Sequence, residues 1–370
     1  MKQYWKQILI VGLIVLVALI GLYYVLDNTS YNAIQIDKTH GSIGTDNGNY
    51  IQYSDGVLKY SKDGVSMLTK EGTQLWNQSC QMTHPVVEMC GDTVAVADQG
   101  GTSILVLQKN GLKGEIKTTR PIEKVTVSNQ GIVGTILQDE ENPQVVCYDA
   151  KGNILVQHKA TLEKTGYPMD IAISQDGNVL LVSYLCIDGN VIRTKAVYYN
   201  FGESGDDKEN HQVAQGEYAD VIVPTTAFLD KDTSLLVSED SFILYEGLDG
   251  PEEEKVVKLD KEIKSVAYNK DYIVFVLKNT DKSAYELRAY DTKGNQIMSV
   301  EFEGEYTNIK LTEKQVILFA GNELAIFNMK GICKYQGSIE SSIIEMFPIS
   351  GFNKYMMIST SGFEEVQLVK

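Results

Sequence analysis

The chain has 370 residues, of which 43% are hydrophobic and 22% are charged, as is ordinary for a folded protein. Seven prolines against 31 glycines exclude a proline-rich or collagen-like chain. Forty-nine acidic against 33 basic residues give a net charge of −16. No cationic field is available for phosphates, so nucleic acid is not an expected partner.

The N-terminal segment 8–26 is apolar and carries no charge. As a helix it would span about 28 Å, close to the thickness of the hydrocarbon core of a membrane. Lys2 and Lys6 precede it, and basic residues tend to stay on the cytoplasmic side. We therefore predict a short cytoplasmic tail over residues 1–7, a single transmembrane helix, and an extracytoplasmic body held at the cell membrane.

A cleaved signal peptide is the alternative interpretation of this segment. Signal peptides usually have an apolar run of about 7–15 residues that ends in a small-residue cleavage site. Here the run is longer, and the sequence from Tyr23 to Asp27 contains no such site. An uncleaved signal-anchor is favoured, and cleavage remains the alternative.

Five cysteines are an odd number, so outside the membrane at least one thiol stays unpaired. Cys80 and Cys90 could form a local disulfide, and the sequence leaves that pairing open. The absence of a CxxC pair gives no support for a redox site or a zinc ribbon.

From residue 49 onward, the chain consists of short apolar or alternating runs separated by turn signals. No segment of this body shows a sustained helical period. Asp-Gly pairs, which close tight hairpins, punctuate the runs. These pairs are Asp55-Gly56, Asp63-Gly64, Asp176-Gly177 and Asp188-Gly189. The pattern predicts an all-β body.

A longer repeat is superimposed on these strands. A strand ends in an apolar or aromatic residue, a mostly polar triplet follows, and then comes a glycine, as in Tyr148–Gly152 and Tyr290–Gly294. The interval is about 40 residues, which is typical of four-stranded propeller blades. The repeated glycines are Gly72, Gly111, Gly152, Gly202, Gly250, Gly294 and Gly331.

Two stretches resemble known propeller repeats. The hairpin from Asp170 to Ser183, with its Ser-x-Asp-Gly turn, looks like the first hairpin of WD40-like and YVTN-type propellers. The segment from Leu68 to Trp76 is similar to the strand–turn–tryptophan element of PQQ-like propeller repeats. As a whole, the chain resembles a group of single-pass, membrane-anchored β-propeller proteins of Gram-positive bacteria. That resemblance implies a propeller outside the membrane and no established activity.

We predict a β-propeller over residues 49–370, with eight blades favoured and seven as the alternative. The C-terminal stretch 342–370 supplies only about three strands. Ala33–Asp37 alternates like a strand, so the linker 27–48 would contribute the strand that completes the last blade and closes the ring. Its alternation stops at Lys38, and from there to Asn49 we expect a loop. The expected full blades are 49–79, 84–118, 120–160, 168–217, 220–260, 263–303 and 306–338.

Motifs for chemistry are sparse. None of the four histidines lies in an HxH or HExxH arrangement, and we find no Walker loop, GxGxxG or GxSxG motif. We therefore predict no catalytic residue, no metal site and no cofactor. The sequence does not favour an enzyme.

Propellers usually bind ligands at the mouth of the central channel, which the loops entering the innermost strands surround. We expect a binding or scaffolding module there, with an envelope protein or a glycan as the partner. The alternative is an extracytoplasmic hydrolase or lyase, motivated by a convergence of His84, Arg120 and Asp170 at this mouth. The candidate ligand-binding residues are His84, Arg120, Tyr167, Asp170 and Asp220.

Overall fold

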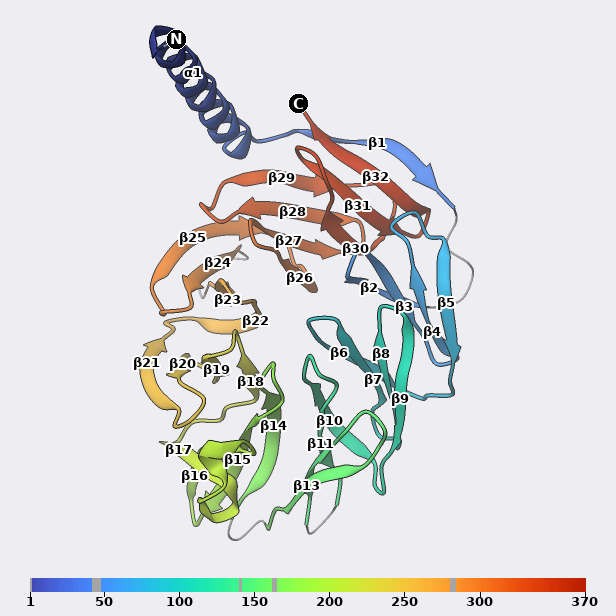
Figure 1. The fold of residues 1–370 in the computed structure, drawn as a ribbon, viewed down its shortest axis with the longest axis vertical. Helices are drawn as coiled ribbons and strands as arrows, with labels where there is room; N and C mark the ends of the chain where they lie inside the picture. The colour runs from blue at the N-terminus through green and yellow to red at the C-terminus, as the bar shows by residue number, and fades with distance from the viewer. Residues whose placement is uncertain (1, 42–47, 140–141, 162–164, 280–283) are drawn as a thin grey trace. The chain divides into compact units, whose positions relative to one another are not determined.

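The computed structural model describes residues 2–41, 48–139, 142–161, 165–279 and 284–370. Across these ranges, 32 strands form eight antiparallel sheets of four strands each. In seven sheets the strands follow one another in chain order. The fold is therefore an all-β propeller of eight blades, as predicted (Figure 1).

The chain divides into two compact units. One comprises residues 1–43, 298–300 and 304–370, and the other comprises residues 44–297 and 301–303. We call them the anchor unit and the pocket unit. The final strand of the sixth consecutive blade contributes to both units.

Within its described residues, the pocket unit holds six blades. The first three are β2 (Asn49–Tyr53), β3 (Gly56–Tyr60), β4 (Gly64–Leu68) and β5 (Gln74–Ser79); β6 (Pro85–Cys90), β7 (Thr93–Asp98), β8 (Ser103–Gln108) and β9 (Gly111–Lys117); and β10 (Ile122–Val127), β11 (Val133–Leu137), β12 (Gln144–Tyr148) and β13 (Ile154–Lys159). The next three are β14 (Tyr167–Ile173), β15 (Val179–Asp188), β16 (Val191–Asn200) and β17 (Gln212–Ala219); β18 (Thr225–Phe228), β19 (Thr233–Val237), β20 (Ser241–Glu246) and β21 (Glu252–Lys258); and β22 (Glu262–Tyr268), β23 (Tyr272–Lys278), β24 (Ala284–Asp291) and β25 (Gln296–Glu303). Two short 3₁₀ turns, Glu203–Gly205 and Glu209–His211, lie between β16 and β17.

The first strand of each of these blades lies toward the middle of the pocket unit, and the fourth strand lies at its outer edge (Figure 1). The second and third strands are almost wholly buried, as in β7, β12 and β19. Apolar clusters join neighbouring blades, for example Ile104 and Val106 of one blade with Val133 of the next. Burying these side chains between sheets stabilises the stack at roughly 25 cal/mol per Å² of apolar surface.

The repeated glycine turn has a local structural cause. Asp149 Oδ1 accepts hydrogen bonds from the backbone nitrogens of Lys151 (2.8 Å) and Asn153 (2.9 Å). Gly152 between them adopts a positive φ of 86°, which glycine reaches without a steric cost. The side chain of Asp291 makes the same two bonds around Gly294. At these two copies, and at Asn328 before Gly331, the glycine motif is thus an Asx turn between the third and fourth strands.

The anchor unit contains the helix and two blades. One blade is β26 (Asn308–Leu311), β27 (Gln315–Ala320), β28 (Glu323–Asn328) and β29 (Cys333–Ser338). The other is β30 (Ile343–Pro348), β31 (Lys354–Ser359) and β32 (Gly362–Val369), with β1 (Ala33–His40) added at its outer edge. An N-terminal strand therefore completes the last blade by pairing antiparallel with β32.

β1 is longer than the sequence indicated. It continues to His40, whereas the alternation in the sequence ends at Lys38. The register with β32 shifts between Ile36 and Lys38, because Asp37 forms a bulge. A bulge moves later side chains to the opposite face, so the alternation is lost although the strand continues. The remainder of the loop expected before Asn49 lies mostly at 42–47, outside the described residues.

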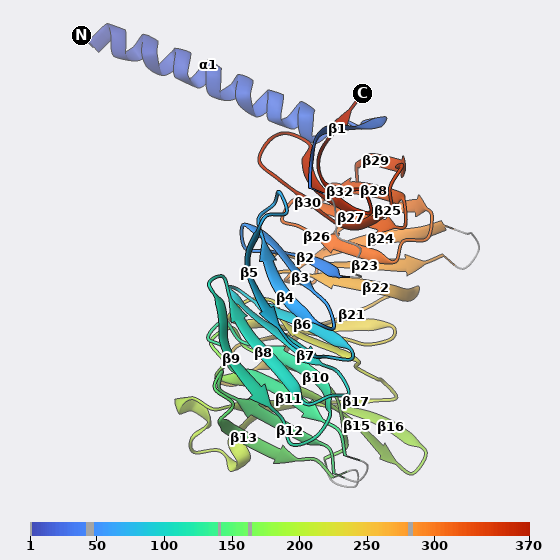
Figure 2. The same ribbon diagram turned by 90° about the vertical axis from the view of Figure 1, so that its right-hand side faces the viewer.

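α1 (Lys2–Asp27) extends away from the sheets of the anchor unit and meets them only at its C-terminal end (Figure 2). The stretch Ile10–Asp27 is long and apolar enough to cross a membrane. Its side chains are exposed, for example 61% for Leu13 and 60% for Val17. A helix with apolar side chains exposed in this way is not a core helix of the propeller, and it is a candidate transmembrane span.

Candidate functional site

A pocket of about 370 Å³ lies among the first strands of five consecutive blades in the pocket unit, β6, β10, β14, β18 and β22. We call it the first-strand pocket. Each strand contributes a polar side chain to its lining, and each of these comes from within a strand rather than from a loop. They are Glu88, Lys124, Asp170, Thr226 and Tyr268.

Asp170 connects three of these strands. Its Oδ2 accepts hydrogen bonds from the backbone nitrogen of Thr226 at 2.7 Å and from its hydroxyl at 3.1 Å. Its Oδ1 lies 3.2 Å from the Nζ of Lys124. Both carboxylate oxygens are engaged and the side chain is only 14% exposed, so Asp170 acts first as a positioning group within the pocket wall.

Glu88 is different, because within the described residues its carboxylate has no hydrogen-bond partner. The side chain is exposed to the space of the pocket, yet protein atoms surround it on most sides. This desolvation, with the nearby negative charge of Asp170, raises the pKa of Glu88 from 4.5 to about 7, against the opposing effect of Lys124. The group therefore exchanges its proton near neutral pH.

Tyr268 lines the same pocket as Glu88. It is 39% exposed, and burial together with the charges of Glu88 and Asp170 raises its pKa to about 12. The phenol therefore stays neutral at physiological pH. A neutral aromatic ring next to a carboxylate is a favourable environment for a small organic cation.

Four of the five predicted site residues do not line this pocket. Tyr167, the first residue of β14, donates a hydrogen bond from its hydroxyl to Glu123 at 2.6 Å, and burial followed by that contact raises its pKa to about 12. His84 is exposed before β6, and its backbone nitrogen donates to Asp98 at 2.9 Å. Both lie where chains enter first strands, as expected, but only Asp170 belongs to the pocket.

The other two predicted residues lie at separate places. Arg120 forms an ion pair with Asp139 in the approach to β10. Asp220 is exposed in the loop after β17, with a positive φ of 55°. Over the described residues, the lining of the pocket therefore does not include His84, Arg120 or Asp220.

The sequence did contain a signal for the residues that were missed. Glu88 interrupts the apolar run Val86-Val87-Glu88-Met89, and Lys124 directly precedes Val125-Thr126-Val127; both stretches form first strands. A charge in the middle of a first strand points either into a blade interface or into the channel, and the channel is far less costly. Charged residues within the first strands, beyond the entries to those strands, therefore indicate the site.

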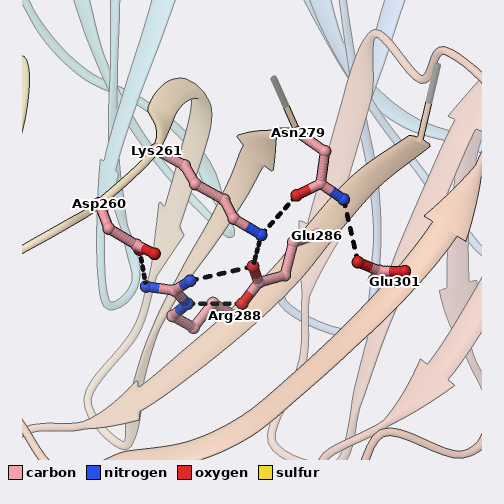
Figure 3. Close-up of polar contacts among 6 residues, drawn as sticks. All are labelled: Asp260, Lys261, Asn279, Glu286, Arg288 and Glu301. Carbon is pink, nitrogen blue, oxygen red and sulfur yellow. Dashed lines mark hydrogen bonds and ion pairs between the residues drawn. The ribbon is translucent and has the colours of Figure 1, made fainter. Parts of the chain in front are cut away.

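A second charged cluster in the pocket unit surrounds the buried side chain of Glu286, on β24 (Figure 3). Arg288 donates to its two oxygens at 2.6 and 2.9 Å, and Lys261 donates to one of them. Lys261 also contacts Asn279, which reaches Glu301 at 3.3 Å. Arg288 further pairs with Asp260 at 2.7 Å. This closed network is suited to structure rather than to ligand binding.

Metal chemistry finds no support in the parts of the chain that the structure describes, where no three histidine, cysteine or acidic side chains gather around one point. All five cysteines are free thiols, so Cys80 and Cys90 do not pair. The described pocket lining combines one exchangeable carboxyl group, one engaged ion pair and the aromatic rings of Phe228 and Tyr268. These groups together are suited to binding a charged ligand.

A family model described as a family of unknown function, DUF5711, matches residues 27–368. The chain belongs to the DUF5711 family. Among curated proteins, none matches this DUF5711 chain in sequence.

Solved structures nevertheless share its fold. BamB from Moraxella catarrhalis superposes with a TM-score of 0.54 at 13% identity, covering 91% of this chain and 98% of that one. AztD from Citrobacter koseri gives a TM-score of 0.54 at 12% identity, covering 80% of this chain and 87% of that one. At such low identity the likeness establishes the β-propeller fold of this DUF5711 member and nothing about its ligand.

Proposed function

We propose that this protein is a membrane-anchored, extracytoplasmic propeller that binds a ligand in the first-strand pocket. The observation that carries the proposal is the convergence of five strands on one pocket, where Glu88 has no hydrogen-bond partner among the described residues. A carboxyl group with a pKa near 7 that points into a pocket is suited to a ligand rather than to the fold. The length and apolar surface of α1 support the anchor.

The charges around the pocket favour a ligand that carries a cationic group. Asp170 and Lys124 largely neutralise each other at 3.2 Å, and Tyr268 is uncharged. Glu88 therefore sets the sign of the pocket, and the net charge of −16 on the chain adds a long-range attraction for cations. A primary ammonium group can pair with Glu88 while it packs on the Tyr268 ring.

Both expected partner classes can supply such a group. An envelope protein can present a lysine side chain, and a glycan can present an amino sugar. The proposal keeps the extracytoplasmic orientation predicted from Lys2 and Lys6 and the likeness to membrane-anchored propellers of Gram-positive bacteria. It also keeps the likeness to WD40-like and PQQ-like repeats.

The alternative of a hydrolase or lyase depended on a convergence of His84, Arg120 and Asp170. Of these, only Asp170 lines the pocket, and it is occupied by Thr226 and Lys124. No observation therefore favours catalysis over binding.

The binding proposal is tested by titrating the purified full-length protein with lysine amide and with norleucine amide, both acetylated at the α-nitrogen so that only lysine amide carries an ammonium group. We expect saturable binding of lysine amide alone, weakened about tenfold in Glu88→Gln and also weakened below pH 6, where Glu88 is protonated. Equal binding of the two amides, or unchanged binding in Glu88→Gln, would contradict the proposal.

The anchor is tested separately by washing membranes with high salt and measuring the mass of the protein that remains. We expect the full-length chain to stay with the membranes, because about 18 apolar residues cannot be extracted by salt. Release of a shortened chain would show that the segment is a cleaved signal peptide. Labelling of the body on intact cells by a membrane-impermeant amine reagent tests the orientation.

A further inference from the structure

The C-terminal end of α1 is held by a buried lysine of the anchor unit. Lys334 on β29 is only 2% exposed, and its Nζ donates to the carbonyl oxygens of Leu26 (2.7 Å) and Asp27 (3.2 Å). The last carbonyls of a helix have no partner within the helix, and a cation there is favourable. Burial lowers the pKa of Lys334, and the charge of Asp27 opposes this effect.

Further contacts fix the same junction. Asn328 donates to the carbonyl oxygen of Asp27 at 2.9 Å, and Lys330 pairs with the carboxylate of Asp27 at 2.7 Å. Past the helix, the backbone nitrogen of Tyr31 donates to the carbonyl of Lys334 at 2.8 Å. We call Asn328, Lys330 and Lys334 the helix socket. The helix socket holds the end of α1 directly against the β28–β29 turn, so no free linker separates the helix from this blade.

The loop between β30 and β31 lies next to this junction. The side-chain amide of Asn353 in that loop donates to the hydroxyl of Tyr31, and its backbone carbonyl accepts from Leu368 at 3.0 Å. Both ribbon views place the loop beside the end of α1 (Figures 1 and 2). Phe352 precedes Asn353 in this tight turn and is 53% exposed.

We propose that the β30–β31 loop lies in the membrane interface, with the ring of Phe352 among the lipid headgroups. This inference rests on the proposed membrane span of α1. If the apolar stretch Ile10–Asp27 fills the bilayer, the membrane surface passes through the helix socket, since the stretch ends there. The loop beside the socket then meets the same surface.

The chemistry around the socket fits a membrane interface. Aromatic and lysine side chains concentrate at that depth, where rings pack on acyl chains and ammonium groups reach water. Lys330 Nζ lies 4.9 Å from the centre of the Tyr24 ring at the end of α1. Phe352 would add a second point of contact beside the helix and so restrict the tilt of the anchor unit over the membrane.

The test measures tryptophan quenching in the full-length chain, reconstituted into nanodiscs whose lipids are brominated either just below the headgroup, to reach an interfacial ring, or deep in the acyl chain, to reach the middle of α1. Trp5 and Trp76 are replaced by phenylalanine, and a single tryptophan is introduced as Phe352→Trp. Ile187→Trp is the matched control, because Ile187 is 71% exposed at the tip of a hairpin in the pocket unit. Leu16→Trp, 54% exposed on α1, reports whether the helix is in the bilayer.

We expect brominated lipid to reduce the emission of Phe352→Trp and Leu16→Trp by about twofold, and to leave Ile187→Trp unchanged. If Leu16→Trp is quenched and Phe352→Trp is not, the helix spans the membrane and the interfacial loop is refuted. If neither is quenched, the membrane anchor fails and this inference fails with it. Equal quenching of Ile187→Trp would also refute a specific contact at Phe352.

Discussion

Two carboxylates of the pocket unit have opposite surroundings. Glu286 is 4% exposed and accepts hydrogen bonds from both Arg288 and Lys261 (Figure 3). Glu88 points into the first-strand pocket, and within the described residues no donor reaches it. One carboxylate pairs with two cations, and the other has a pKa raised to about 7.

This difference indicates which charged groups in the fold can bind a ligand. Desolvation disfavours a charged carboxylate unless hydrogen bonds and opposite charges compensate for it. Around Glu286 the compensation is complete, so the network supports the blade. Around Glu88 this compensation is incomplete, so a ligand with a cationic group can supply the hydrogen bond and the opposite charge that the protein does not provide.

The largest effect is expected from breaking the compensated site. Glu286→Ala leaves Lys261 and the guanidinium of Arg288 without their common acceptor, and Arg288 is only 12% exposed. Losing one partner of a buried ion pair costs about 3–5 kcal/mol. Chemical denaturation of the full-length protein should show a lower free energy of unfolding by that amount.

The matched control is Asp260→Ala, which removes the exposed partner of the same Arg288. The Asp260 side chain is 70% exposed, so its loss should cost no more than about 1 kcal/mol. Similar losses in both variants would mean that burial does not distinguish the two contacts, and the comparison would fail.

An intermediate effect is expected at Asp170, the engaged carboxylate of the pocket. Asp170→Ala removes the acceptor for the backbone nitrogen and hydroxyl of Thr226 and the partner of Lys124. We expect a loss of about 2–3 kcal/mol, because a backbone donor and a partly buried cation lose their acceptor. Thr226→Val removes only the hydroxyl bond and should cost about 1 kcal/mol, which equilibrium unfolding can resolve.

The fold was largely predictable because its signals are local. The Asx turn at Asp149 and Gly152 uses residues two to four apart, so its repeat is visible in the sequence. The alternation at Ala33–Ile36 likewise revealed the strand that completes the last blade. The end of that strand was missed because the bulge at Asp37 depends on pairing with β32, more than 300 residues away in the chain.

The pocket was less predictable, because its contacts join different blades. Asp170 was chosen for its place near the start of a hairpin, and the sequence contained no indication that Thr226 and Lys124 would bind it. Glu88 was missed because the site was expected at the entries to the first strands, and Glu88 stands further along, within β6. Whether a charge is compensated depends on which strands lie opposite, and that is set by three-dimensional packing.

A smaller effect, with a distinctive pH dependence, is expected from Glu88→Gln. Because the folded-state pKa of Glu88 is raised from 4.5 to about 7, the folded protein binds more protons between these values. The wild type therefore loses stability as pH rises through that window, and glutamine does not. Glu88→Gln should match the wild type near pH 4 and be more stable at pH 8.

The expected gain at pH 8 is roughly 1 kcal/mol, since exposure to the pocket reduces the full effect of the shift. Thermal melts of both proteins at the two pH values measure it, and Lys124, Asp170 and Tyr268 face Glu88 equally in both. A constant difference at all pH values would show that the carboxyl group does not titrate near 7. The pocket would then lack the uncompensated charge on which the binding proposal depends.

The smallest effect is expected at Arg120, a residue nominated from the sequence that lies outside the pocket. Its partner Asp139 is 22% exposed and Arg120 is 37% exposed, so Arg120→Ala should cost less than about 1 kcal/mol. Arg120→Lys, which keeps the charge, should cost less still. Neither change should alter the affinity for lysine amide, because the ammonium group is proposed to bind at Glu88. A large loss of affinity in Arg120→Ala that Arg120→Lys restores would move the binding site to the channel mouth. The uncompensated charge of Glu88 would then no longer mark the binding site.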